Sequence, residues 1–509
     1  MTLQFPRDIR KDVFVITAVP KRFVAPVVMG LGLAMIATAA PALAKSGARV
    51  GGASNAVVAF VDTGINPYHK VFRDNSPRAF KHPSTYIPGF PKDAQALRLT
   101  FDADDYWDAV KADCKRVWSK IKPGRLYWFP GTKIVGGITF EPAGPLNCDD
   151  SEPQAGGRIL DPDGHGTMVA SRATGAGYGA CPDCRVVSVQ FPTSIPILNP
   201  SESTDHAVKA IRWAANNSSW IDAQSNSWGP VVPLWEPTGE AGLLTANPEL
   251  VRAVEEVSRR HLAFWASGNG ALFRFGVLGH PTLLAPHMGP SAVIVGGHDS
   301  GYVNTWPGFP PHVVSDSCAS WAADHEELKK SRDSEGGGTS GATPFAAGGA
   351  GGIVLEARRI LRDSGTGVVK GVVASGRSGH VSKGPLKDGK FTIKEWRDVL
   401  FKTATDRPAR RHEDGPPCEV EPYRGAPYAP TPVKWTDVPE GYPEYVHIGY
   451  GAVDDPAMSV AAKVLRGQKK LPDRSDTDAF FENDRRARTL LHELFSQGPD
   501  LGAGAAAGR

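Results

Sequence analysis

Three residues of this 509-residue chain have the types and the order of a nucleophilic catalytic site: Asp62, His165 and Ser340. A serine hydroxyl is a weak nucleophile at neutral pH, so it needs a base to take its proton and a third group to orient that base. Histidine and aspartate can fill these two roles. The sequence therefore contains the residues needed for serine attack on a carbonyl carbon.

Each of the three lies where a strand or a helix can position it. Asp62 ends the apolar run VVAFV, which predicts a buried strand with the carboxylate at its C-terminal end, where α/β sheets place their ligands. His165 lies between glycines, just before a helix of small residues. Ser340 precedes the helical run 342–361, so its N–H is expected at a helix N-terminus, where an oxyanion would form.

The three runs resemble the active-site motifs of the subtilisin-like serine proteases (subtilases, peptidase family S8). They read VVAFVDTG around the aspartate, HGTMVAS at the histidine and GTSGATPFAAG at the serine. The order Asp, His, Ser is also that of the subtilisins. The run ASGNG at 266–270 resembles the oxyanion-hole motif of the family, and GYGAVD at 449–454 resembles the turn before its last core helix. The resemblance extends over about residues 50 to 466.

The resemblance implies a serine endopeptidase that needs no cofactor. Ser340 would attack the peptide carbonyl, His165 would carry the proton to the leaving amine, and Asp62 would orient the imidazole and stabilise its cation. Asn269 and the N–H of Ser340 would bind the oxyanion. The family analogy places the substrate between two segments that form the walls of the first specificity pocket: Ser227, Trp228 and Gly229, and Ala266, Ser267 and Gly268. Trp228 either lines this pocket or packs beneath it.

Two other classes of protein remain open. A catalytically silent relative would bind peptides in the same cleft, although every catalytic position holds the required residue type. An α/β-hydrolase esterase would need a strand directly before the serine and its acid and base after it, such as Asp406 and His447. The stretch 329–337 before Ser340 is charged and glycine-rich rather than strand-like.

The chain alternates between strand and helix patterns, which predicts an α/β fold with a parallel sheet between helices. Runs with strand character lie at 56–61, 185–191, 222–227, 262–266 and 292–296, and helical periodicity is found at 204–216 and 248–260. The family resemblance implies the same architecture, in a single catalytic domain with large loop insertions.

Composition and charge are those of a globular protein. Hydrophobic residues make up 41% and charged residues 22% of the chain, enough for a large core. The net charge is +3 (57 − 54) and the basic residues are scattered along the sequence, so the total charge implies neither nucleic acid nor an acidic partner. The family resemblance implies polypeptide substrates, and we expect a monomer.

The N-terminus has the layout of a secretory signal. Basic residues from Arg7 to Arg22 precede the uncharged run 24–44, which ends in Ala-Leu-Ala. We predict cleavage after Ala44 and secretion. An uncleaved membrane anchor is the alternative, because 21 uncharged residues can span a bilayer. Only 17 residues, 45–61, would then precede Asp62, so we expect no folded prodomain unless sequence is missing upstream.

We expect three parts in the chain: the signal at 1–44, the peptidase domain at 45–467 with an insertion at about 75–160, and a tail at 468–509. The tail contains a candidate helix at 478–495 and a glycine- and alanine-rich end expected to be disordered. We predict two long surface loops. Residues 364–390 are rich in glycine, serine and lysine, and residues 415–443 are rich in proline and tyrosine.

Within the insertion, residues 105–121 predict an amphipathic helix. The aspartates at its start, Asp102, Asp104, Asp105 and Asp108, lack the glycine and the downstream glutamate of an EF-hand loop, so they predict a solvated helix start. The resemblance implies that structural Ca²⁺ is possible, but no site can be identified.

Export would allow the six cysteines to form disulfides, with 15 possible connectivities. Our predicted pairs are Cys181 with Cys184, Cys114 with Cys148, and Cys318 with Cys418. A zinc half-site or a redox motif is the alternative for the Cys-x-x-Cys run. A zinc site would require a second ligand pair, and none is evident in the sequence.

Overall fold

Strand β1 (Val57–Asp62), which ends at Asp62, lies inside an eleven-stranded sheet in the described part of the chain. The strand order is β15-β11-β10-β8-β6-β1-β5-β4-β3-β2, with β12 beside β10. The computed structural model describes residues 55–142, 144, 146–150, 157–191, 200–228, 231–233, 248–267, 277–279, 291–299, 302–304, 311–316, 323–330, 338–376, 381–406, 433–434, 449–483 and 486.

The centre of the sheet is parallel. The strands besides β1 are β2 (Gln95–Ala96), β3 (Tyr127–Trp128), β4 (Ile134–Thr139), β5 (Arg185–Gln190), β6 (Ala223–Asn226), β8 (Leu262–Ala266), β10 (Ala292–Asp299), β11 (Tyr302–Asn304), β12 (Val313–Asp316) and β15 (Val433–Lys434). Strand β1 pairs in parallel with β5 on one side and β6 on the other, and β4, β8, β10 and β12 continue this pattern. The predicted parallel sheet is therefore confirmed at its core.

The edges of the sheet differ from the prediction because they contain antiparallel pairs. Strand β3 is antiparallel to β4, and β11 is antiparallel to β10 and β15. Only a few residues separate β3 from β4 and β10 from β11, and connections this short can join only antiparallel strands. The sheet is mixed but mostly parallel.

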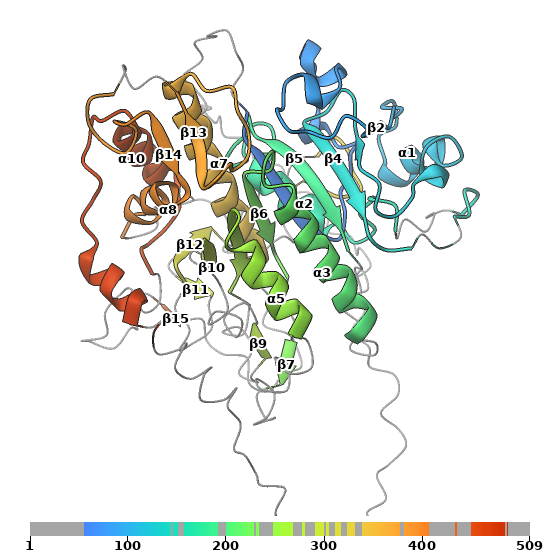
Figure 1. Ribbon diagram of the computed structural model, residues 1–509. Helices are drawn as coiled ribbons and strands as arrows, with labels where there is room; N and C mark the ends of the chain where they lie inside the picture. Colours follow the sequence, from blue (N-terminus) through green and yellow to red (C-terminus); the bar gives the residue numbers. More distant parts are fainter. Residues whose placement is uncertain are drawn as a thin grey trace, which may run out of the picture. The chain divides into compact units, whose positions relative to one another are not determined.

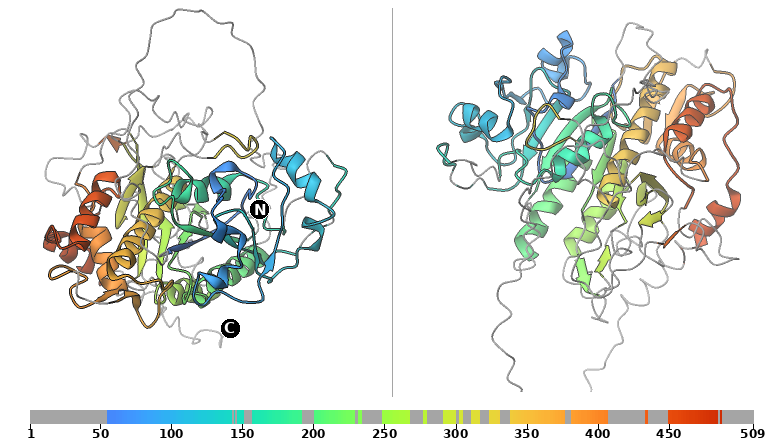
Figure 2. Two further views of the ribbon diagram at one scale, coloured as in Figure 1. Left: turned by 90° about the horizontal axis from the view of Figure 1, so that it is seen from above. Right: turned by 180° about the vertical axis from the view of Figure 1, so that it is seen from behind.

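Helices cover both faces of the sheet (Figure 1). The α-helices are α1 (Tyr106–Asp113), α2 (His165–Thr174), α3 (Pro200–Asn216), α5 (Pro248–Val257), α7 (Thr339–Leu361), α8 (Ile393–Lys402) and α10 (Asp455–Leu465). On β1, Val58 and Phe60 pack into the core cluster that contains residues of α2, α7, α8 and α10. Val57, Ala59 and Val61 pack into a second cluster, with α3 and α5. Successive side chains of β1 thus point to opposite faces of the sheet and divide the core into two layers. Figure 2 shows the long helix α7 from two further directions.

The predicted strands are all present, as β1, β5, β6, β8 and β10, with ends shifted by at most three residues. The predicted helices at 204–216, 248–260 and 342–361 correspond to α3, α5 and α7. Helix 105–121 is shorter than predicted: α1 ends at Asp113, and a 3₁₀ turn follows at Trp118–Lys120. The buried carboxylate of Asp113 accepts hydrogen bonds from Tyr68 and Thr100, which holds this end against the core.

The insertion at about 75–160, expected to be a loop, contains strands of the main sheet. It contributes β2, β3 and β4, and β4 pairs directly with β5 beside the central strand. The stretch 364–390 also differs from the predicted loop, because β13 (Val372–Ser375) pairs with β14 (Lys390–Thr392) in a separate small sheet. A second small sheet pairs β7 (Val231–Pro233) with β9 (Val277–Gly279). Of the predicted loop 415–443, only β15 falls within the described residues.

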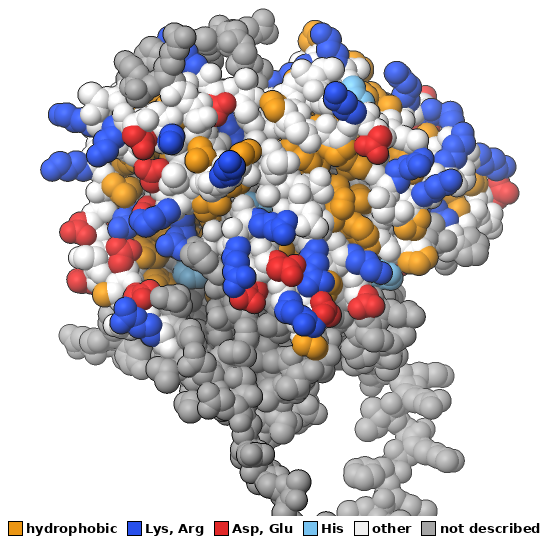
Figure 3. Space-filling model, viewed as in Figure 1, with side chains coloured by type: hydrophobic (Ala, Val, Ile, Leu, Met, Phe, Trp, Pro, Cys, Tyr) orange, Lys and Arg blue, Asp and Glu red, His pale blue; other side chains and the backbone are white. Residues whose placement is uncertain are grey.

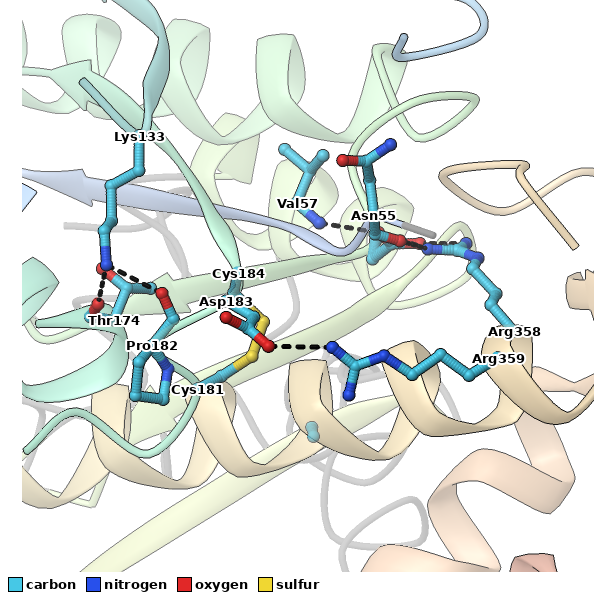
Figure 4. The surroundings of a disulfide bond; sticks show 12 residues. Asn55, Val57, Lys133, Thr174, Cys181, Pro182, Asp183, Cys184, Arg358 and Arg359 are labelled. Atoms are coloured by element: carbon cyan, nitrogen blue, oxygen red, sulfur yellow. Dashed lines mark hydrogen bonds and ion pairs between the residues drawn. A yellow bond between two sulfur atoms is a disulfide. The ribbon is translucent and has the colours of Figure 1, made fainter. Parts of the chain in front are cut away.

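Two of the three predicted disulfides are present, Cys114–Cys148 and Cys181–Cys184. Cys318 and Cys418 lie outside the described residues. The Cys181–Cys184 turn lies against α7, where Asp183 forms an ion pair with Arg359 at 2.8 Å (Figure 4).

In the tail, residues 475–483 are helical, and most of the predicted helix 478–495 beyond them lies outside the described residues. Among the helices that the structure describes, none has the length and apolar character needed to span a bilayer.

Candidate active site

Asp62 lies at the C-terminal end of β1, and its side chain is 2% exposed. Asp62 is in register with Gln190 of β5, and the preceding Val61 is in register with Asn226 of β6. The ends of three parallel strands therefore meet at this edge. From here, Oδ1 of Asp62 lies 2.7 Å from Nδ1 of His165, a residue 103 positions later in the chain.

His165 is the first residue of α2, preceded by Gly164 at a φ of 91°, a backbone conformation that favours glycine. Burial by itself lowers the pKa of His165, but the charge and the hydrogen bond of Asp62 outweigh it and, together with Asp163 and Asp161, raise the pKa to about 9. The side chain keeps 30% of its surface exposed, so a substrate can reach the ring. A carboxylate thus holds Nδ1 of this histidine, an arrangement that suits a general base.

Asp161 links the segments that carry these two side chains. Its Oδ1 accepts hydrogen bonds from Oγ1 of Thr63 (2.7 Å) and from the N–H of Gly164 (2.9 Å). Its Oδ2 accepts from the N–H (2.7 Å) and from Oγ1 (2.6 Å) of Thr167. Because Thr63 follows Asp62 and Thr167 is in the first turn of α2, one fully buried carboxylate connects the end of β1 to the start of the helix.

Asp161 remains ionised in this position. Burial opposes its charge, but the nearby His325 and the hydrogen bonds of Thr167 and Thr63 hold the pKa of Asp161 below its ordinary value. Our sequence analysis did not single out this residue. An aspartate shortly before a helix start is a recognisable signal for a helix cap, but its bond to Thr63 connects residues 98 positions apart and has no local signature.

Ser340 is the second residue of α7, after Gly338 at a φ of 72°. Its hydroxyl donates a hydrogen bond of 2.9 Å to the carbonyl of Ser227, the residue after β6. Within the described residues, the Ser340 hydroxyl is bonded to this carbonyl and not to His165. Catalytic hydrogen bonds often become short only when substrate is bound.

The two predicted substrate-binding segments follow neighbouring strands. Ser227 follows β6, and Ala266 is the last residue of β8, with Asn226 and Trp265 in register across the pair. Ser227, Ala266 and Ser267 are buried. Asn269, Gly229 and Gly268 lie outside the described residues.

Trp228 packs against other aromatic rings. Its ring centroid lies 4.7 Å from that of Phe191, which follows β5, and 5.8 Å from that of Trp265 on β8. The side chain is half-buried against the cluster on the α3 and α5 face of the sheet. Whether Trp228 also lines the first specificity pocket stays a prediction.

The aspartates of the insertion begin a helix. Asp105 caps α1 by accepting hydrogen bonds from the N–H groups of Trp107 (2.8 Å) and Asp108 (3.2 Å), as predicted for a helix start. Over the described ranges, the structure brings together no group of three or more His, Cys, Asp or Glu side chains that could hold a metal ion.

Comparison with known families identifies the class of protein. The model of the subtilase family matches residues 53–407, more than half of the chain, and the chain belongs to this family. It is a serine-type peptidase, and the matched region includes Asp62, His165 and Ser340. No curated protein sequence matches the chain.

The chain is also similar, at low sequence identity, to several solved structures. The prenylagaramide maturation protease PagA has 15% identity over 80% of this chain and 94% of its own, with a TM-score of 0.40. The epidermin leader peptide processing serine protease EpiP from Staphylococcus aureus has 12% identity over 80% of this chain and 76% of its own, with a TM-score of 0.40. A cold-adapted subtilisin-like serine proteinase has 17% identity over 62% of this chain and 88% of its own, with a TM-score of 0.29.

Proposed function

We propose that the protein is a secreted serine endopeptidase that uses Asp62, His165 and Ser340 as its catalytic residues. The observation that carries the proposal is the 2.7 Å contact between Asp62 and His165, two residues from distant motifs, at the sheet edge where Ser227 contacts Ser340. An esterase that relied on Asp406 and His447 would have no need of this pair.

The proposed reaction follows from the roles of the three side chains. Ser340 attacks the peptide carbonyl while Nε2 of His165 accepts its proton, and His165 then gives the proton to the leaving amine. Asp62 holds Nδ1–H and stabilises the imidazolium. The N–H of Ser340, at the start of α7, and the amide of Asn269 would stabilise the oxyanion of the tetrahedral intermediate.

Substitution of each of the three residues tests the assignment. Ser340→Ala, His165→Ala and Asp62→Ala should each abolish most peptide cleavage, and their effects should not add because the residues act as a unit. A serine-directed phosphonate should label the wild type and the matched control Ser119→Ala, a change at an exposed serine, but not Ser340→Ala. Labelling that persists in Ser340→Ala would refute the nucleophile, and full activity of His165→Ala would favour the esterase alternative.

The role of Asn269 needs its own measurement. If its amide contacts the oxyanion only after charge has developed, Asn269→Ala should lower kcat by about 10² to 10³ while KM changes little. A change confined to KM would assign Asn269 to substrate positioning instead.

Secretion is tested at the N-terminus of the exported protein. Sequencing of protein recovered outside the cell should give Lys45 as the first residue, after removal of residues 1–44. Protein that stays in the membrane fraction with residues 24–44 intact would support the membrane-anchor alternative.

A further inference from the structure

A cavity of about 590 Å³ opens between the insertion and the end of α3. It is lined by residues 93–95 and 122–126, together with Pro91, Trp213 and Asn217. Its volume falls within the range of ordinary ligand-binding sites, about 300 to 1,000 Å³. The proposed catalytic reaction uses none of these residues.

The cavity is separate from the candidate active site. Leu126 and Trp213 belong to the core layer on the α3 and α5 face of the sheet, whereas the alternation of β1 places Asp62 on the face of α2 and α7. Strand β3, which begins next to Leu126, is three strands away from β1. At 4.7–4.9 Å per strand, this amounts to about 15 Å within the sheet alone.

The charge around the cavity is positive. Lys122 and Arg125 line it, both are exposed, and within the described residues neither has a carboxylate within 4.0 Å. Asp93 is the one acidic side chain among the lining residues. Figure 3 shows many Lys and Arg side chains over the insertion, on the upper right of that view. Among the side chains that line the cavity, the two basic residues Lys122 and Arg125 outnumber the one acidic residue Asp93.

One wall of the cavity is aromatic. Trp213 is half-buried, and its ring is fixed edge-on against Trp220 at 6.1 Å. An indole beside two cations that have no carboxylate partner among the described residues suits a ligand that has both apolar and anionic groups. An extended polypeptide with acidic side chains combines these groups.

We propose that this cavity is an accessory site that binds an acidic segment of a polypeptide substrate, outside the segment that is cleaved. Arg125 and Lys122 pair with Asp or Glu carboxylates, and Trp213 packs against the apolar part of the bound segment. This inference rests on the proposed peptidase function. Exposed ion pairs are weak individually, so the site adds selectivity among substrates rather than tight binding.

Two matched peptides test the proposal with the full-length protein. Both contain the same cleavable sequence, and a flexible linker of about ten residues joins it to four glutamates in one peptide and to four glutamines in the other. The glutamate peptide should have a KM lower by about 3- to 10-fold, with similar kcat, and the difference should disappear at 0.5 M salt because exposed pairs are screened. The double variant Lys122→Gln/Arg125→Gln should lose the difference. The control Lys111→Gln/Lys115→Gln, with the same charge change on the insertion but outside the cavity lining, should keep it.

Equal KM values for the two peptides in the wild type, or a preference that survives in Lys122→Gln/Arg125→Gln, would overturn the accessory site. If neither peptide is cleaved, the proposed function is at fault and the cavity is tested by binding alone. In that case, fluorescence anisotropy should detect the labelled glutamate peptide on the wild type but not on Lys122→Gln/Arg125→Gln. Binding of a single-stranded oligonucleotide at this cavity, without binding of the glutamate peptide, would also overturn the proposal.

Discussion

Replacing Asp161 by asparagine should weaken both the fold and the catalytic geometry. The substitution keeps the shape of the side chain but removes its charge and replaces one acceptor oxygen by an amide donor. If the amide NH₂ takes the place of Oδ2, it faces the N–H of Thr167, which now lies 2.7 Å from Oδ2. If it takes the place of Oδ1, it faces the N–H groups of Gly164 and Asp163 instead.

The first orientation costs less because it leaves one backbone donor without an acceptor rather than two. A buried unsatisfied donor costs about 1–3 kcal/mol, and the remaining hydrogen bonds lose the extra strength of a charged acceptor. We therefore expect Asp161→Asn to lower the free energy of unfolding by about 2–4 kcal/mol. Urea unfolding, monitored by tryptophan fluorescence, measures this difference.

The effect on catalysis should be larger on kcat than on KM. Asp161 touches neither substrate nor the reacting atoms, but it fixes the Asp62 and His165 segments relative to each other through Thr63 and Thr167. A displacement of catalytic groups by about 1 Å can cost 10²-fold in rate, so we expect kcat to fall by about 10- to 100-fold.

Asp163→Asn is the matched control for Asp161→Asn. Asp163 is exposed, and it raises the pKa of His165 by more than Asp161 does. A purely electrostatic influence on His165 would therefore make Asp163→Asn at least as harmful. If the two variants had the same kcat, or if Asp161→Asn retained wild-type kcat, Asp161 would not be a positioning residue.

Three further predictions follow from the charges and the disulfides. Because His165 must be neutral to act as the base and its pKa is raised to about 9, kcat/KM should rise with pH and level off above about 9, and Asp62→Asn should shift this inflection to lower pH. A pH profile that is flat between 6 and 10 would contradict this. Asp222→Ala should lower the free energy of unfolding by about 3–5 kcal/mol, because it leaves Arg358 charged and buried without its carboxylate. Urea unfolding measures this difference. A loss below about 1 kcal/mol would be inconsistent with an ion pair in which both side chains are 0% exposed. The double variant Cys114→Ser/Cys148→Ser, which lacks one disulfide, should have a free energy of unfolding lower by roughly 4 kcal/mol. Reducing agent should therefore lower the Tm of the wild type more than that of this variant.

Apolar runs located the core of the fold well. Strand β1 is buried along its whole length, as expected for a strand covered by helices on both faces, and such strands are recognisable from sequence as uninterrupted apolar runs. The prediction that Asp62 and His165 act together also depended on local signals, a strand end and a helix start. The structure places them in contact because the strand end and the helix start meet at one edge of the sheet.

The sequence analysis missed strands that are short and contacts between residues far apart in the chain. Strand β4 contains the pair Gly136-Gly137, and glycines weaken the sequence signal for a strand. The fold nevertheless needs a small residue at position 137, because a Cβ there would lie 2.8 Å from the side chain of Ile159. Strands β2 and β3 have two residues each and give no periodic pattern. That Lys122 and Arg125 border a cavity together with Trp213 of α3 depends on tertiary packing between segments far apart in the sequence, and composition and net charge contain no such information.

The position of Ser340 depends on contacts along the whole of α7. At Gly348, a Cβ would lie 2.6 Å from the carbonyl oxygen of Ala173, so the backbone of α7 touches that of α2, the helix that begins at His165. Further along α7, Arg358 donates hydrogen bonds to the buried carboxylate of Asp222, the residue immediately before β6 in the sequence. These contacts hold α7 against α2 and against the start of β6, about two turns (Gly348) and about five turns (Arg358) after Ser340. We therefore expect this glycine contact and this buried salt bridge to influence how Ser340 lies relative to His165, although neither contact involves a proposed catalytic residue.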